Sequence, residues 1–233
     1  MEEILNSGLS ELGITPAPKA IKNLETYFEY LEERNRVMNL TAISGEEDVA
    51  RLHFLDCAQL LSLCDFKEKK VIDVGTGAGF PGLVLKIIQP DMNLTLLDSL
   101  NKRIDFLSET CMRIELNDVQ CIHARAEEIA PEQRAAYDIA VSRAVARLGV
   151  LCEMCLPYIR VGGLFIAMKG PDCDVEVCEA ANAMQLLGAQ LKDTIRYTIP
   201  GTDITHAAVI IEKIKPTHPK YPRKWAQIKK QPL

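Results

Sequence analysis

Along roughly the first 65 residues, apolar positions recur at the spacing of a helix that buries one face. The clearest stretch consists of Ile21, Leu24, Tyr27, Phe28 and Leu31. This spacing of three and four positions predicts an amphipathic helix. Further along, Ser44-x-x-Glu47 is a capping-box pattern and predicts that another helix begins there. We therefore expect residues 1–65 to form a helical extension.

From about residue 70 the pattern changes to short apolar runs that alternate with helical stretches. The runs lie at 71–74, 94–97, 119–122, 137–141 and 164–168, with two late strands around Ile195 and at 207–211. Helices are expected between them, including single helices at about 148–158 and 175–187. Alternating strands and helices are typical of a mainly parallel sheet covered by helices on both faces. The sequence thus predicts an α/β, Rossmann-like domain at residues 66–213.

The last segment, residues 214–233, differs from the rest in charge and proline content. The net charge of the chain is −5, yet no acidic residue follows Glu212, whereas the basic residues there are Lys213, Lys215, Lys220, Arg223, Lys224, Lys229 and Lys230. Its prolines predict that regular structure cannot persist for long. An acidic body with a basic tail suggests contact with a polyanion. A solvated, disordered tail explains the same charges equally well.

Composition restricts the class of protein. The chain has 233 residues, 48% of them hydrophobic and 25% charged, which is ordinary for a soluble globular protein. No apolar run reaches the ~18 residues that a membrane-spanning helix needs. The acidic start, Met1-Glu2-Glu3, lacks the order of a signal peptide, so we expect a cytoplasmic protein. We also expect it to be a monomer.

Neither cysteines nor histidines predict a metal site. Most of the eight cysteines lie in apolar runs, where a reduced thiol packs as a small apolar group. Cys152-x-x-Cys155 has no second pair at zinc-ligand spacing. The four histidines are scattered along the chain. His53 and Asp56, three positions apart, form either a structural pair, which we favour, or part of the border of a substrate pocket.

A glycine-rich stretch follows the first strand, and ligands of such sheets bind at the carboxyl ends of the strands. Gly75-x-Gly77-x-Gly79 lets the backbone approach a ligand closely. A dinucleotide site would instead read G-x-G-x-x-G. Here Phe80 and Pro81 occupy the first helical turn, which leaves less room for a diphosphate. A cofactor without phosphates, S-adenosylmethionine, fits better, although a plain glycine turn is the alternative.

Charged residues follow the next two strands. Asp98 ends the second strand, about 20 residues past Gly75, where an acid accepts hydrogen bonds from ribose hydroxyls. Alternatively, Asp98 is the N-cap of the helix that follows. After the third strand comes Arg125-Ala126-Glu127-Glu128, where the backbone could face an adenine ring and Glu127 could anchor the site, while a solvated charge cluster is the alternative.

The fourth strand ends at Ser142-Arg143-Ala144, the level at which a transferred methyl group should meet its substrate. The Asn/Asp-Pro-Pro-aromatic motif of amino-group methyltransferases is missing, and no cysteine nucleophile lies at this level. Arg143 can grip a carboxylate, a phosphate or a guanine edge, or it makes a surface salt bridge. Methylation at guanine N7 would need no base, because N7 exposes a lone pair and loses no proton. Alignment alone would then supply most of the catalysis.

Several stretches together resemble one family, the bacterial 16S ribosomal RNA guanine-N7 methyltransferases, also called glucose-inhibited division protein B. They are Asn39-Leu40-Thr41-Ala42-Ile43, His53-x-x-Asp56, Asp73-x-Gly75-x-Gly77-Ala78-Gly79-Phe80-Pro81-Gly82, Asp98-Ser99-x-x-Lys102-Arg103, Arg125-Ala126-Glu127, Ser142-Arg143-Ala144, Lys169-Gly170 and Tyr221-Pro222-Arg223-Lys224. The resemblance implies a Rossmann-like methyltransferase that transfers a methyl group from S-adenosylmethionine to N7 of a guanine in 16S ribosomal RNA of the small subunit.

The resemblance also implies roles for individual residues. Contacts to the cofactor are implied for Gly75, Phe80, Ala126, Glu127 and Arg143, with Arg143 also catalytic, and contacts to RNA for Lys169, Arg223 and Lys224. Asp98 is added on its spacing alone. The chain departs from the family at Arg34, where a Trp is frequent, at Cys57, where a Ser is frequent, and after Trp225, where Gly-x-Pro is usual.

Two other classes of protein remain as alternatives. A nicotinamide-dependent Rossmann oxidoreductase would share the alternating pattern, but the glycine spacing and Phe80 are unfavourable to it. A ribosome-assembly protein that binds RNA without catalysis would explain the basic tail, but it would have no need of a cofactor loop.

Overall fold

The computed structural model describes residues 1–143 and 146–233, and within them seven strands form one sheet in the order β3-β2-β1-β4-β5-β7-β6. The strands are β1 (Lys70–Val74), β2 (Asn93–Asp98), β3 (Val119–His123), β4 (Tyr137–Arg143), β5 (Ile159–Lys169), β6 (Ala189–Thr198) and β7 (Thr205–Lys213). β1 to β5 are parallel, and β7 runs antiparallel to both β5 and β6. Strand order reverses between β1 and β4, which opens a crevice at their carboxyl ends.

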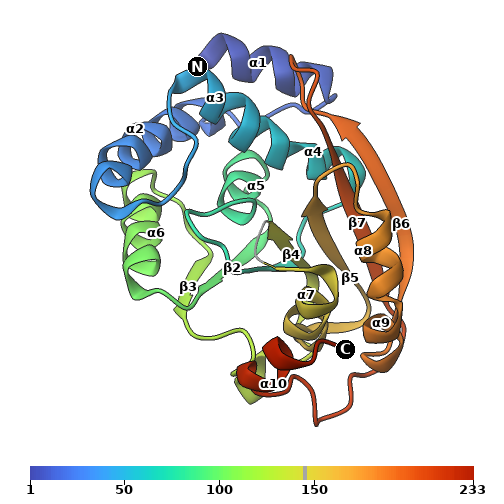
Figure 1. Cartoon of the computed structure of the whole chain (residues 1–233). Coiled ribbons are helices and arrows are strands. Elements are labelled where there is room, and N and C mark those ends of the chain that lie inside the picture. The colour runs from blue at the N-terminus through green and yellow to red at the C-terminus, as the bar shows by residue number, and fades with distance from the viewer. Residues whose placement is uncertain (144–145) are drawn as a thin grey trace.

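Helices cover both faces of the sheet (Figure 1). One layer holds α1 (Glu2–Glu11), α2 (Ala20–Met38), α3 (Glu46–Val49), the π-helical η1 (Ala50–Leu55), α4 (Asp56–Leu63), α5 (Gly82–Ile88) and α6 (Asn101–Arg113). The other holds α7 (Leu148–Cys155), α8 (Asp174–Glu179), α9 (Ala181–Leu186) and α10 (Trp225–Lys230). Successive strand residues alternate between these layers: Ile139 and Val141 join the first core, and Ala140 joins the second.

The helical start of the chain and the α/β, Rossmann-like alternation are both confirmed. The helical extension shares its core with the sheet, because Leu5 and Leu31 belong to the same buried cluster as Val71. A boundary between residues 65 and 66 stays a prediction, as does one at 213.

The capping box predicted at Ser44 is wrong. Gly45 occupies the N-cap, and no side chain caps the helix. Glu47 instead pairs with Arg51 one turn later. Acidic side chains in the first turn of α3 stabilise the helix N-terminus, because they offset the positive end of the helix dipole. The helix then passes through the π-helical η1, which apolar spacing does not reveal.

Two helices are shorter than expected. The stretch at 148–158 forms α7 only as far as Cys155, and residues Leu156–Tyr158 form a 3₁₀ turn because Pro157 has no N–H to continue the α-helical hydrogen bonds. The stretch at 175–187 forms two helices, α8 and α9, instead of one.

The tail holds regular structure only over the six residues of α10, as its prolines predict, but the alternative of a disordered tail is wrong. Residues after Lys213 fold back onto the α7 side of the sheet and end in α10 (Figure 1). Tyr221 and Ile228 are buried in the same core as α7, which gives the tail an apolar anchor that its prolines do not prevent. Arg134 also donates to the carbonyl oxygens of three tail residues, Thr217, His218 and Tyr221.

Residues 1–143 and 146–233 contain no helix with the length and apolarity needed to cross a bilayer. The same residues bring together no group of three or more His, Cys, Asp or Glu side chains that could hold a metal ion. Cys152 and Cys155 are buried free thiols, as expected of core residues.

Candidate active site

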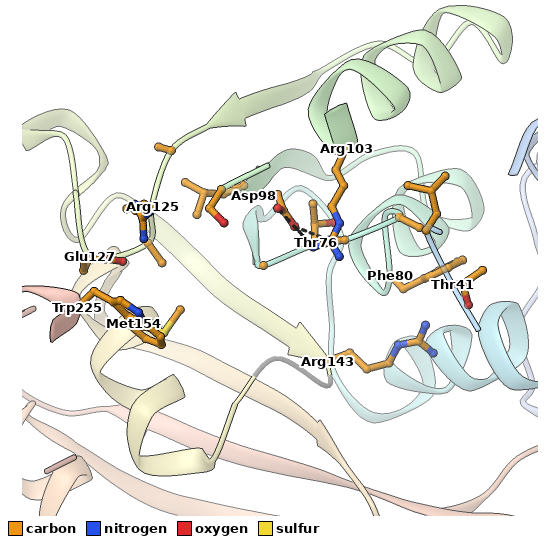
Figure 2. A pocket seen from close by; sticks show the side chains of 18 of the residues that line it. Thr41, Thr76, Phe80, Asp98, Arg103, Arg125, Glu127, Arg143, Met154 and Trp225 are labelled. Atoms are coloured by element: carbon orange, nitrogen blue, oxygen red, sulfur yellow. Dashed lines mark hydrogen bonds and ion pairs between the residues drawn. The ribbon is translucent and has the colours of Figure 1, made fainter. Parts of the chain in front are cut away.

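A cavity of about 610 Å³ lies at the carboxyl ends of β1 to β4. Every residue predicted to contact the cofactor lines it: Gly75, Phe80, Asp98, Ala126, Glu127 and Arg143. The loops after four neighbouring strands therefore meet at one site (Figure 2). The cavity also includes Thr41, His53, Met154 and Trp225, to which the sequence had given no definite cofactor role.

The glycine loop is held by a buried carboxylate at the end of β1. Asp73 Oδ2 accepts hydrogen bonds from Thr76 Oγ1 and from the Gly82 N–H, both at 2.8 Å. Burial raises the pKa of Asp73 to about 7, against the opposing effect of these two hydrogen bonds. A side chain at Gly82 would put Cβ 2.8 Å from Asp73 Oδ2, so the glycine is required by this close approach.

Within the loop, Gly77 leaves room for a ligand. Its φ is +62°, and a Cβ built there would meet no atom within 4 Å. Its N–H donates to Asp98 Oδ2 at 2.9 Å. The loop backbone thus faces open space beside a carboxylate that can accept hydrogen bonds from hydroxyls.

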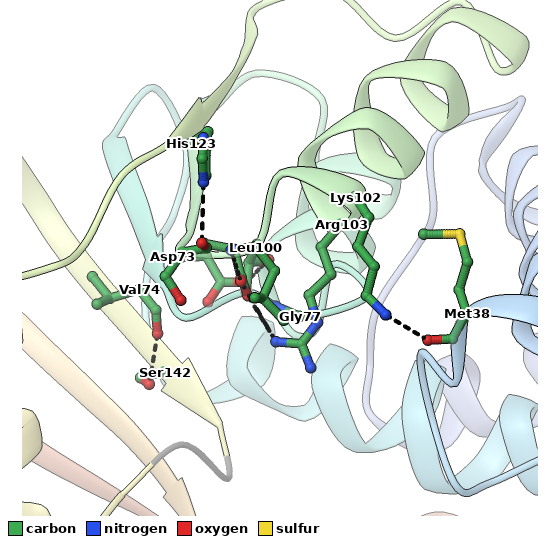
Figure 3. Close-up of polar contacts among 12 residues, drawn as sticks. Met38, Asp73, Val74, Gly77, Leu100, Lys102, Arg103, His123 and Ser142 are labelled. Carbon is green, nitrogen blue, oxygen red and sulfur yellow. Dashed lines mark hydrogen bonds and ion pairs between the residues drawn. The ribbon is translucent and has the colours of Figure 1, made fainter.

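Asp98 connects the glycine loop to the start of α6. Its Oδ1 accepts from the Leu100 N–H at 2.9 Å, and Oδ2 lies 3.1 Å from Arg103 Nη1. The N-cap of α6 is Leu100, so the alternative that Asp98 is that N-cap is wrong. Nearby, Lys102 Nζ donates to the Met38 carbonyl and fastens α6 to the end of α2 (Figure 3).

The loop after β3 supplies Ala126 and Glu127. Ala126 is buried, and its carbonyl accepts from Tyr158 Oη at 3.0 Å. Figure 2 shows Glu127 at the same end of the cavity as Met154 and Trp225, away from Phe80 and Arg143. The cavity thus has Arg125, Glu127, Met154 and Trp225 at one end and Phe80 with Arg143 at the other.

Arg143 is a largely buried cation at that second end, with 15% of its side chain exposed. Nη1 donates to Asp56 Oδ2 at 3.1 Å and to the Leu52 carbonyl at 3.2 Å. Its guanidinium carbon also lies 4.8 Å from the centroid of the Phe80 ring, a cation–π arrangement. The alternative of a surface salt bridge is wrong, because this ion pair is buried.

His53 contacts the other nitrogen of the Arg143 guanidinium. Its Nδ1 accepts from Arg143 Nη2 at 2.7 Å, since a guanidinium can only donate. The ring hydrogen is therefore on Nε2, which donates to Thr41 Oγ1 at 2.8 Å. Burial, followed by the charge of Arg143, lowers the pKa of His53 to about 3, so the ring is neutral at physiological pH. His53 borders the cavity, and it is connected to Asp56 through Arg143, which both residues contact, instead of forming a direct pair with it.

Asp56 extends this network across the sheet. Its Oδ1 accepts from Tyr197 Oη at 3.0 Å and pairs with His206 Nδ1 at 2.9 Å, residues of β6 and β7. Ser142 Oγ donates to the Val74 carbonyl at 2.9 Å and ties β4 to β1 (Figure 3). Ala144, the last residue of the Ser-Arg-Ala motif, lies outside the described residues.

The residues expected to contact RNA differ in exposure. Lys169 Nζ lies 2.7 Å from Glu176 Oε1 and donates to the Ala146 carbonyl, with 11% of the side chain exposed. Arg223 is joined to buried Glu153, whereas Lys224 is exposed. Contact of these three residues with RNA stays a prediction.

Strand order, the antiparallel β7 and the loop after β1 place the chain in a known structural class: it has the Rossmann-like fold of S-adenosylmethionine-dependent methyltransferases. The fold is similar to that of M. jannaschii TYW2 in complex with AdoMet, with a TM-score of 0.57 and 13% identity over 74% of this chain and 80% of that one. It is also similar to a SAM-dependent methyltransferase from Aquifex aeolicus, with a TM-score of 0.53 and 16% identity over 72% of this chain and 94% of that one.

Sequence comparison then defines the family. The model of GidB, described as rRNA small subunit methyltransferase G, matches residues 20–200, and the chain belongs to this family. It is 48% identical to ribosomal RNA small subunit methyltransferase G of Alkaliphilus metalliredigens and 45% identical to that of Clostridium tetani, in each case over 99% of this chain and 98% of the relative. The resemblance given by the motifs is confirmed, and neither the oxidoreductase nor the non-catalytic alternative is favoured.

Proposed function

We propose that this protein transfers a methyl group from S-adenosylmethionine to N7 of a specific guanine in 16S ribosomal RNA of the small subunit. The observation that carries the proposal is the convergence of all six predicted cofactor residues on one cavity, in a chain of the GidB family. We also propose that it acts in the cytoplasm.

The residues present fit S-adenosylmethionine. The open space at Gly77 admits a ligand against the loop backbone, and the Asp98 carboxylate can accept hydrogen bonds from ribose hydroxyls. Ala126 and Glu127 would hold the adenine, while Phe80 and Arg143 would hold the methionine end. When bound, this cofactor supplies a methyl group already activated on a sulfonium.

The polypeptide's own contribution is to align the reacting groups. A guanine N7 offers its lone pair without losing a proton, and His53, the nearest imidazole to Arg143, is neutral with both ring nitrogens engaged. Arg143, fixed by Asp56 and His53, is a rigid donor suited to a guanine edge or to the cofactor's carboxylate. Alignment of reacting groups can contribute about 7–11 kcal/mol, so no side-chain base is required.

The RNA would lie against the mouth of this cavity and the tail. Lys224 offers an exposed cation there. Arg223 is paired with Glu153, and Lys169 with Glu176. Each would contact RNA through the part of its side chain that remains accessible. Phosphate contacts of this kind provide much of the affinity for nucleic acid.

Mass mapping of 16S RNA from cells with and without the gene tests the proposal. One 7-methylguanine should disappear on deletion and return when the gene is restored, but not when the restored gene carries Arg143→Ala. Purified protein should transfer labelled methyl to naked 16S RNA or to 30S particles. An unchanged methylation map, together with no transfer to either substrate, would refute the proposed function.

A further inference from the structure

One wall of the cavity comes from the tail. Trp225, the first residue of α10, lines the cavity together with Ala126, Glu127 and Met154. Figure 2 shows Trp225 beside Met154 at the end opposite Phe80 and Arg143. No other segment after β7 reaches the cavity within the part of the chain that the structure describes.

Two anchors hold Trp225 in this place. On one side, the Arg223 backbone N–H and its Nε both donate to Glu153 Oε1 at 2.8 Å, and Nη2 donates to Oε2 at 2.6 Å. Glu153 is fully buried on α7. On the other side, Ile228 is fully buried in the core beneath α10. Trp225 lies between these anchors, so its position is fixed before any ligand arrives.

The side chain of Trp225 is placed to contact a ligand instead of packing in the core. Trp225 is 37% exposed, whereas Ile228, on the same helix, is fully buried. A large aromatic ring that borders a cavity while remaining partly exposed offers a face for another planar group. The backbone of residues 124–127 lies at the same end, where the proposed function puts the adenine.

We infer that Trp225 is a cofactor-binding residue that covers the adenine ring of S-adenosylmethionine. The C-terminal segment thereby completes the adenine end of the site. The inference rests on the proposed function, because it assumes the cofactor occupies this cavity. Stacking of a base on an aromatic side chain contributes about 1–3 kcal/mol, which corresponds to about a 5- to 150-fold change in dissociation constant.

The chain offers a direct spectroscopic probe, because Trp225 is its single tryptophan. S-adenosylhomocysteine titrated into the full-length protein should change the tryptophan emission saturably, with the dissociation constant found by calorimetry. Trp225→Ala should weaken that binding about 5- to 150-fold, and Trp225→Phe, which keeps an aromatic face, should weaken it less. Gln227→Ala, at an exposed position of the same helix, is the matched control and should bind as the wild type does.

A second ligand tests whether the lost affinity belongs to the adenosine part of the cofactor. Methylthioadenosine keeps the adenosine part of the cofactor and lacks its amino-acid part, so Trp225→Ala should weaken both ligands by the same factor. Tight binding of S-adenosylhomocysteine with unchanged emission, or with full affinity in Trp225→Ala, overturns the inference. So does a variant that loses affinity only for RNA, because the ring would then stack on a nucleotide. If the wild type binds no S-adenosylhomocysteine by calorimetry, the proposed function itself fails.

Discussion

At the residue scale, the buried pair of Arg143 and Asp56 couples the chemistry of the site to the stability of the fold. Asp56 is 1% exposed, and it has further hydrogen bonds from Tyr197 and His206. Removal of one member leaves the other charge buried without its main partner. Catalytic and structural effects of changes here will therefore appear together.

Arg143→Ala should abolish methyl transfer and also lower the free energy of unfolding by about 3–5 kcal/mol, because Asp56 keeps a buried charge without its main partner. Urea denaturation measures the second effect. Arg160→Ala is the control, since Arg160 pairs with Asp138 at a site where 53% of the arginine side chain is exposed and should cost under about 1 kcal/mol. Equal costs for the two variants would contradict this prediction, and unchanged turnover in Arg143→Ala would refute its catalytic role.

His206 should make stability depend on pH. The hydrogen bond to Asp56 raises its pKa above the ordinary 6.5, against burial. The folded-state pKa is the higher one, so this contribution is complete below pH 6.5 and is lost as the pH rises through the raised pKa. Over that window the wild type should lose more stability than His206→Gln, as urea denaturation at several pH values would measure. His123→Gln, at an exposed histidine, should keep the wild-type dependence.

At the element scale, the turn from β1 into α5 depends on the space between Gly82 and Asp73. The two residues approach so closely that the loop has one arrangement available, in which Asp73 fixes Thr76 and the start of α5. The cavity-facing backbone of the glycine loop follows from this arrangement.

Gly82→Ala should destabilise the protein by about 1–3 kcal/mol, as overpacking of a close contact does, and should weaken binding of S-adenosylhomocysteine. Its Cβ would meet Asp73 at 2.8 Å and Leu96 at 3.0 Å. Gly170→Ala is the control, because a Cβ there meets nothing within 4 Å. Thermal melts with and without ligand measure both effects, and equal melts for the two variants would show that the contact does not matter.

The sheet and the strand-end residues could be predicted because their signals are local. Short apolar runs mark the strands, and parallel strands bring the residues that follow them, such as Gly75, Asp98 and Arg143, to one edge. The support for Arg143 could not be predicted, since Asp56 and His53 meet it through tertiary packing. Trp225 had one signal, an aromatic residue in a polar tail, but nothing in the sequence placed that tail against α7.

At the scale of the whole molecule, charge is separated between an acidic body and a basic end that is nevertheless folded. Lys224, Lys229 and Lys230 are exposed on or next to α10. Complete deletion of the tail would also remove Arg223 from buried Glu153 and would expose the core. Charge substitutions therefore test the contact with RNA more cleanly than truncation does.

Replacement of Lys224, Lys229 and Lys230 by glutamine should weaken binding to 16S RNA. It should also reduce the slope of log affinity against log salt by about 2 to 3, because each lost phosphate contact removes about 0.7–0.9. The melting temperature should stay near that of the wild type. Fluorescence anisotropy over a series of salt concentrations measures the slope.

A control removes the same charge from the opposite end of the molecule. Lys67, Lys69 and Lys70 lie just before or at the start of β1, at the amino ends of the parallel strands. Their replacement by glutamine should leave the salt slope of RNA binding unchanged. If both triple variants bind alike, the tail lysines are only solvated.

The folded tail also determines when the site is complete. Of the described residues that line the cavity, Trp225 comes last in the chain. During synthesis it therefore leaves the ribosome after all the others, and the cavity lacks this wall until α10 has emerged and folded onto α7. Under the proposed function, a nascent copy that has already completed its sheet still lacks one wall of its cofactor site.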